Sequence, residues 1–131
     1  MTVFVDTSYF IALMYSSDKW HAAAVRADDP RLDLVTSNEV VNETISVLRA
    51  RNSLSLALDF LREIREGHDV HILYVDAATQ SAAWDLYARY AGGGASAVDC
   101  TSFALMRRLG LSSAFTFDAH FQRAGFEIIR A

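Results

Sequence analysis

Four acidic residues occupy positions from which they could do metal chemistry together. Asp6 and Asp118 each follow a short apolar run that favours a buried strand. Glu43 and Asp99 lie in helical patterns, on faces that they share with apolar residues. Clustered carboxylates repel one another unless cations neutralise them, and hard oxygen ligands favour Mg²⁺ or Mn²⁺ over zinc. Such a site polarises phosphate oxygens and lowers the pKa of a bound water, which suits phosphodiester hydrolysis.

Each of these acids also has a structural explanation when it is taken alone. An Asp after a strand is a common N-cap for the following helix, which applies to Asp6 and Asp118. Ser96 and Asp99 have the spacing of a capping box, although a carboxylate has two oxygens and can both cap and bind a metal. Glu43 borders an apolar face and can extend its charged end into water. The four acids together therefore indicate a metal site more strongly than any one of them does alone.

The elements that must position the acids follow from hydrophobic periodicity and capping signals. We predict strands over 2–5, 32–36, 70–75, 114–117 and 127–130. We predict helices over 7–16, 19–27, 37–51, 53–66, 76–90 and 96–110, a flexible glycine segment over 92–94 and a short helical turn before the last strand. Strands separated by helices pair in parallel. The predicted fold class is α/β, a three-layer α/β/α sandwich with a mainly parallel central sheet and a crevice beyond the carboxyl ends of its strands.

The 131 residues fit one domain, over 1–131, and their apolar fraction of 52% is enough for one packed core. A single cysteine, Cys100, excludes a disulfide framework and multi-cysteine metal sites. The longest apolar run, 9–15, is too short to span a bilayer, and no basic residue precedes Lys19. We therefore expect a cytoplasmic protein with no membrane partner.

The net charge of −4 argues at first against a nucleic-acid partner. The four acids account for that whole charge, and the remaining acids balance the basic residues, which are arginines except for Lys19. Four arginines close the helices that carry Glu43 and Asp99, and they could either bind RNA phosphates or complement the helix dipoles. These arginines are Arg49, Arg51, Arg107 and Arg108.

The acids lie in four short segments: Val5-Asp6-Thr7-Ser8, Asn42-Glu43-Thr44, Ser96-Ala97-Val98-Asp99 and Phe115-Thr116-Phe117-Asp118-Ala119-His120-Phe121. In this order, and in a chain of this length, the segments resemble those of the PIN-domain ribonucleases, and within them the VapC-like toxins of toxin–antitoxin pairs. The resemblance covers the chain almost from end to end. The closing segment is its most distinctive part.

This resemblance implies a Mg²⁺- or Mn²⁺-dependent endoribonuclease that cuts single-stranded or loop RNA. It also implies a cognate antitoxin protein as partner and a homodimer. The residues that would hold the metal and carry catalysis are Asp6, Glu43, Asp99 and Asp118. Thr116 matches the hydroxyl residue that the family has near its last acid, and Thr7 or Ser8 could hydrogen-bond the first acid.

Other interpretations remain open. The chain could be an RNA-processing nuclease without a toxin role, or a PIN-fold module that binds RNA or protein without cutting, although a module has no need of the four acids. A phosphatase of the haloacid dehalogenase type is disfavoured because Ser8 stands where that family has a second Asp. We interpret His120 as structural and Cys100 as a buried thiol. Core or dimer packing is the role we predict for the aromatic residues that could otherwise stack bases: Trp20, Trp84, Tyr87 and Tyr90.

Overall fold

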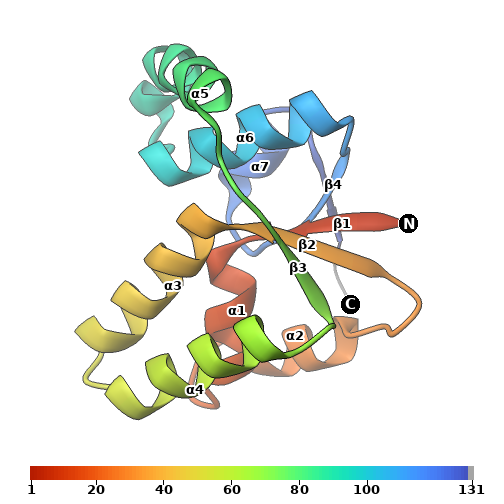
Figure 1. Ribbon diagram of the computed structural model, residues 1–131, viewed down its shortest axis with the longest axis vertical. Coiled ribbons are helices and arrows are strands. Elements are labelled where there is room, and N and C mark those ends of the chain that lie inside the picture. Colours follow the sequence, from red (N-terminus) through yellow and green to blue (C-terminus); the bar gives the residue numbers. More distant parts are fainter. Residues whose placement is uncertain (130–131) are drawn as a thin grey trace.

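The computed structural model describes residues 1–129, whose strands form a five-stranded parallel sheet (Figure 1). The order along the sheet is β3-β2-β1-β4-β5, and each neighbouring pair is parallel. The strands are β1 (Thr2–Val5), β2 (Asp33–Ser37), β3 (Val70–Leu73), β4 (Ser113–Phe115) and β5 (Glu127–Ile129). The predicted α/β class with a parallel sheet is confirmed.

Helices cover both faces of this sheet and give the predicted three layers. On one face lie α1 (Thr7–Met14), α2 (His21–Ala27), α3 (Asn38–Ala50) and α4 (Leu54–Glu66), below the sheet in Figure 1. On the other lie α5 (Ala77–Tyr90), α6 (Ala97–Leu109) and α7 (Ala119–Arg123), with a 3₁₀ turn over Ala91–Gly93 between α5 and α6. None of the helices described is both long and apolar enough to cross a membrane.

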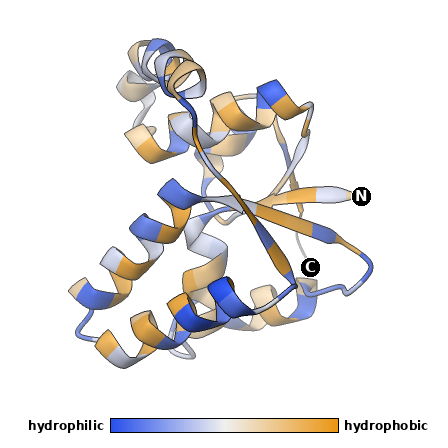
Figure 2. Cartoon of the chain, in the orientation of Figure 1, coloured by the Kyte–Doolittle hydropathy of each residue, from blue (hydrophilic) through white to orange (hydrophobic). Residues whose placement is uncertain are grey.

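The core lies on both sides of β1, the central strand. Val3, Phe4 and Val5 are fully buried, which explains why the strand is a continuous apolar run without alternating polar residues. Helices such as α3 and α4 are instead amphipathic, with apolar and polar residues on different faces (Figure 2), whereas α1 is mostly apolar and largely buried. This packing fixes the end of β1, and with it Asp6, in the interior.

Several predicted boundaries shift by one or two residues, and local hydrogen bonds explain two of these shifts. The strand expected over 114–117 is β4 at Ser113–Phe115, because Thr116 turns the chain and its hydroxyl accepts from the Asp118 amide at 2.9 Å. The helix expected over 19–27 begins at His21, because the Asp18 carboxylate accepts from the Trp20 amide at 2.9 Å and holds a turn before it. The last strand was expected to reach Arg130, which lies outside the described residues.

The strand order creates a crevice at the site that the sequence predicted. β1 and β4 are neighbours, but β1 leads into helices on one face of the sheet and β4 into α7 on the other. In parallel sheets the chain opens a crevice at the carboxyl ends of two such strands. Asp6 directly follows β1, and Asp118 follows β4.

Candidate metal centre

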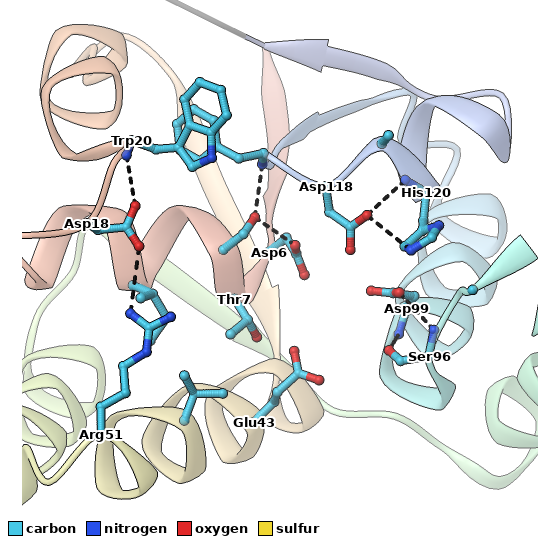
Figure 3. Close-up of a pocket in the computed structure, with 16 residues that line it drawn as sticks. Asp6, Thr7, Asp18, Trp20, Glu43, Arg51, Ser96, Asp99, Asp118 and His120 are labelled. Carbon is cyan, nitrogen blue, oxygen red and sulfur yellow. Dashed lines mark hydrogen bonds and ion pairs between the residues drawn. The ribbon is translucent and has the colours of Figure 1, made fainter.

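A pocket of about 580 Å³ lies beyond the carboxyl ends of β1 and β4. All four of the predicted acids line it: Asp6, Glu43, Asp99 and Asp118. Figure 3 shows their carboxylates directed toward a common space, from the end of β1, from α3, from α6 and from the start of α7. Sequence reasoning thus predicted the convergence of these side chains correctly.

Asp6 is the most buried of the four, with 3% of its surface exposed. It occupies the N-cap position of α1 but makes no side-chain capping bond, so the capping explanation does not apply to it. Its Oδ2 accepts from the Ser8 hydroxyl at 3.0 Å and from the Thr116 hydroxyl at 2.9 Å. Its Oδ1 is buried and has no hydrogen-bond partner among residues 1–129. A buried carboxylate oxygen without a partner is costly unless an ion supplies one.

The pKa of Asp6 is raised to about 7: burial is the largest cause, the charges of Asp99 and Glu43 add to it, and the hydroxyls of Thr116 and Ser8 oppose it. The cause is that a desolvated carboxylate among like charges favours its neutral form. A divalent cation in the pocket would reverse this balance, because it would favour the ionised form.

Asp99 lies in the first turn of α6 with 5% of its surface exposed. The capping box is present: the Asp99 Oδ2 accepts from the Ser96 amide at 2.9 Å, and the Ser96 hydroxyl accepts from the Asp99 amide at 3.0 Å. Burial and the Asp118 charge raise the pKa of Asp99, and the Ser96 hydrogen bonds oppose them. The box uses one carboxylate oxygen, so capping leaves the second oxygen for a cation.

Glu43 is half-buried on α3, at the border of the apolar face as predicted. Burial raises its pKa, the charges of Asp99 and Asp118 add to the effect, and the Thr7 hydroxyl opposes it. Three of the four acids are therefore held in surroundings that disfavour their negative charge, and a bound divalent cation would offset this cost.

His120 lies beside the acids, although the sequence interpretation gave it a structural role. Asp118 caps α7 by accepting from the His120 amide at 2.9 Å, and this turn brings the His120 Nε2 to 3.5 Å from the Asp118 Oδ1. Asp99, Asp118 and His120 each offer a ligand atom within 4.8 Å of the others. The sequence signal for this placement is that His120 follows Asp118, an acid that caps a helix, by two residues.

The predicted hydroxyl residues divide into two roles. Ser8 and Thr116 both donate to Asp6 and lie 3.1 Å apart, and the Ser8 hydroxyl also accepts from the Phe117 amide at 2.9 Å. They therefore tie the end of β1 to the end of β4 around one carboxylate. Thr7 points instead toward α3, where its hydroxyl donates to the Val40 carbonyl at 3.5 Å.

Of the four predicted arginines, only Arg51 lines the pocket. Arg49 borders a separate groove between α3 and α4. Arg107 donates to the Tyr90 hydroxyl and the Ala124 carbonyl, both at 3.3 Å, and Arg108 lies 3.8 Å from the Asp76 carboxylate. Helical rise explains this placement, because eight residues separate Asp99 from Arg107, or about 12 Å along α6.

The donor set fits a divalent cation. It consists of several carboxylates, one of them with an orphaned buried oxygen, and a nearby imidazole. Hard oxygen donors suit Mg²⁺ and Mn²⁺, and the imidazole is better suited to Mn²⁺ than to Mg²⁺.

With this fold and site, the chain belongs to the PIN domain family, whose model matches residues 3–127. It is similar to a protein of Mycobacterium tuberculosis named 23S rRNA-specific endonuclease VapC20, with 37% identity over 130 residues that cover 98% of each chain.

The structure is also similar to the crystal structure of M. tuberculosis VapC20, described as a sarcin-ricin loop cleaving toxin. The TM-score is 0.90 at 35% identity, over 98% of this chain and 99% of that one. VapBC-1 from nontypeable Haemophilus influenzae matches with a TM-score of 0.66 at 17% identity, over 98% of this chain and 96% of that one, which shows a shared fold.

Proposed function

We propose that the chain is a Mg²⁺- or Mn²⁺-dependent endoribonuclease and the toxin of a toxin–antitoxin pair. The observation that carries the proposal is the convergence of four acids on one pocket, with a buried oxygen of Asp6 that has no hydrogen-bond partner among residues 1–129. RNA is the substrate we favour because a relative 37% identical over nearly the whole chain is named as an endonuclease of 23S rRNA. The proposal treats residues 1–131 as one nuclease domain that works in the cytoplasm, where its RNA is.

In this proposal Asp6, Asp99 and Asp118 hold one or two cations, and Glu43 binds a cation or orients the attacking water. When bound, the cation polarises the phosphate and lowers the pKa of water. Ser8 and Thr116 hold the Asp6 Oδ2, which leaves its Oδ1 free to face the cation. His120 lies close enough to Asp99 and Asp118 to serve as a further ligand.

The proposed partners are an antitoxin protein that neutralises the enzyme and a second copy of the chain in a homodimer. Large apolar side chains exposed on α4 and α5 offer surface for protein contacts. These side chains are Leu54, Leu58, Trp84 and Tyr87.

The test is RNA cleavage by folded protein with Mg²⁺ or Mn²⁺. Asp6→Asn and Asp99→Asn should each lower the rate by about 100-fold or more, because each removes a charged group at the reacting centre. Asp85→Asn, the same change on the exposed face of α5, should cleave like the wild type. Calorimetric titration with Mn²⁺ should show binding that both site variants weaken.

Undiminished cleavage by Asp6→Asn and Asp99→Asn would contradict the assignment of the site. A folded wild type that neither cleaves RNA nor binds Mn²⁺ at millimolar concentration would instead favour a non-catalytic binding module.

A further inference from the structure

The pocket that holds the acids has a second wall made of aromatic rings. Trp20 and Phe117 line it, and Figure 3 shows Trp20 on the side away from His120 and Asp99. The two rings lie flat on each other, with centroids 5.1 Å apart and planes 2° from parallel. Because Phe117 directly precedes Asp118, the aromatic wall is fixed relative to the acids.

The pair is the outer end of a longer stack that is anchored in the core. Phe117 stacks on Tyr9 at 6.2 Å, and Tyr9 stacks on Phe115 at 4.4 Å. Tyr9 and Phe115 are each 1% exposed, and the Tyr9 hydroxyl donates to the Ala24 carbonyl at 3.1 Å. The position of the Trp20 ring is therefore held from below by buried side chains.

Trp20 nevertheless keeps 41% of its surface exposed. Its backbone is held on both sides, because its amide donates to Asp18 at 2.9 Å and its carbonyl accepts from the Ala24 amide at 2.9 Å. A large ring that is fixed in place but left open at the rim of a pocket is prepared to contact a ligand.

Two cations lie near this ring. The ammonium of Lys19, on a flexible side chain, lies over the Trp20 ring, 5.5 Å from its centre. Arg51 lines the same pocket, 3.7 Å from the Asp18 carboxylate and with its guanidinium 5.5 Å from the centre of the Tyr15 ring. An exposed aromatic ring that attracts a cation matches a nucleotide, because a base can replace the ammonium on the ring while the ammonium turns to the phosphates.

We propose that Trp20 is a stacking platform for an unpaired nucleobase next to the scissile phosphate, with Lys19 and Arg51 contacting the flanking phosphates. This inference rests on the proposed ribonuclease function. A base within a helix is covered on both faces, so the platform selects looped or single-stranded RNA. Every base has a π face, so Trp20 favours unpaired RNA without reading its sequence. This role differs from the core or dimer packing that the sequence predicts for Trp20.

The second tryptophan supplies a matched control. Trp84 is 66% exposed on α5, which covers the other face of the sheet from α2. In a Trp84→Phe variant, Trp20 is the only tryptophan, and in a Trp20→Phe variant only Trp84 remains. Each variant therefore reports on one ring.

The first measurement is tryptophan emission during titration with a short RNA, with Ca²⁺ in place of Mg²⁺ so that the RNA stays intact. Stacking should quench the emission of Trp84→Phe strongly with an unpaired oligonucleotide and weakly with a duplex of the same length. Emission of Trp20→Phe should change little. Quenching confined to Trp20→Phe, or equal quenching of Trp84→Phe by duplex and unpaired RNA, would overturn the proposal.

The second measurement is cleavage kinetics on an RNA hairpin with a loop. Trp20→Ala should raise KM by about 10- to 100-fold, the effect expected from losing one stacked base, and change kcat much less. Trp20→Phe should restore most of the affinity, and Tyr74→Ala, which removes a 74% exposed aromatic ring that does not line the pocket, should match the wild type. Calorimetric Mn²⁺ affinity should be the same in all of them, whereas a general structural role for Trp20 would weaken it.

A wild-type KM in Trp20→Ala would overturn the stacking role and leave the ribonuclease function standing. A wild type that cleaves no RNA would instead refute the function on which the inference rests. Because Trp20→Ala uncovers Phe117 and could destabilise the fold, Trp20→Phe and the emission of Trp84→Phe test the proposal without that variant.

Discussion

Asp6 shows how much one buried carboxyl group can lower the free energy of unfolding at neutral pH. Its carboxyl group is buried beside other acids, with a pKa raised to about 7 from an ordinary value near 4. Between these two values the folded state holds a proton that the unfolded state releases. The contribution of this group to the free energy of unfolding is therefore full below about pH 4 and is lost as the pH rises through 7, by about 4 kcal/mol.

We expect Asp6→Asn to remove this dependence in metal-free protein. Denaturant unfolding in EDTA should show the variant more stable than the wild type at pH 8, with a smaller difference at pH 5.5. Glu43 and Asp99 also have raised pKa values, which change stability with pH in the same direction. Comparing the variant with the wild type therefore isolates the contribution of Asp6. If the free energy of unfolding had the same slope against pH in the two proteins, Asp6 would not destabilise the fold at neutral pH. Asp85→Asn is the control for the loss of one charge.

Thr116 should tune Asp6 through its hydroxyl. That hydroxyl donates to the Asp6 Oδ2 and lowers the pKa of Asp6, so Thr116→Val should raise it. We expect the acidic limb of the cleavage pH profile to move to higher pH, and Mn²⁺ affinity at pH 7 to fall by about 10-fold, as when a hydrogen bond to a metal ligand is lost. Thr116→Ser should restore both. An unmoved acidic limb would contradict this role.

At the scale of elements, the turn between α5 and α6 is shaped to receive His120. Gly94 has a φ of 101°, and a Cβ added there would lie 3.1 Å from the His120 Cε1. The Arg123 guanidinium joins the same contact, because it donates to the Gly93 carbonyl at 3.2 Å and lies 3.3 Å from the His120 Nδ1. The glycine turn thus sets the position of the imidazole relative to the acids.

We predict that Gly94→Ala lowers stability by about 1 kcal/mol, because a residue with a Cβ is strained at this φ. It should also displace His120 and weaken Mn²⁺ binding, measured by calorimetry. Gly92→Ala is the matched control, since a Cβ at Gly92 meets nothing within 4 Å. Unchanged Mn²⁺ affinity in Gly94→Ala would show that His120 takes no part in the site.

Most elements could be predicted from the sequence because their signals are local. Ser37, Asp76 and Ser96 each cap the predicted helix, and Gly110 ends α6 in the left-handed conformation. The meeting of the acids could be predicted as well, because parallel strands present their carboxyl ends at one edge.

Other features could not be predicted from the sequence because they depend on contacts between distant parts of the chain. The stacking of Trp20 on Phe117 joins residues far apart in sequence, and the packing of Gly94 against His120 joins the turn between α5 and α6 to α7. Whether Arg107 and Arg108 could contact RNA at the site depended on where they lie along α6 and in which direction they point, which the sequence does not give. Both lie near its far end and contact other groups there.

At the scale of the whole molecule, the distribution of charge matters more than its sum. The net charge of −4 equals the charge of the four acids in one pocket, and elsewhere twelve acids balance twelve basic residues. The protein therefore lacks the excess of positive charge with which non-specific nucleic-acid binders attract phosphates. Divalent cations would convert this acidic pocket into a site that attracts phosphate.

RNA affinity should therefore depend on divalent metal more than on bulk charge. In EDTA we expect weak binding of single-stranded RNA, measured by fluorescence anisotropy, with little dependence on salt because few phosphates are neutralised. Ca²⁺ should tighten binding by about 10-fold or more, since it removes the repulsion between the acids and the phosphate. In EDTA, Asp99→Asn should bind RNA more tightly than the wild type, and Ca²⁺ should increase its RNA affinity by a smaller factor. In Asp85→Asn, Ca²⁺ should increase RNA affinity by the same factor as in the wild type. Tight, salt-sensitive binding by the wild type in EDTA would mean that a basic surface, and not the pocket, captures the RNA.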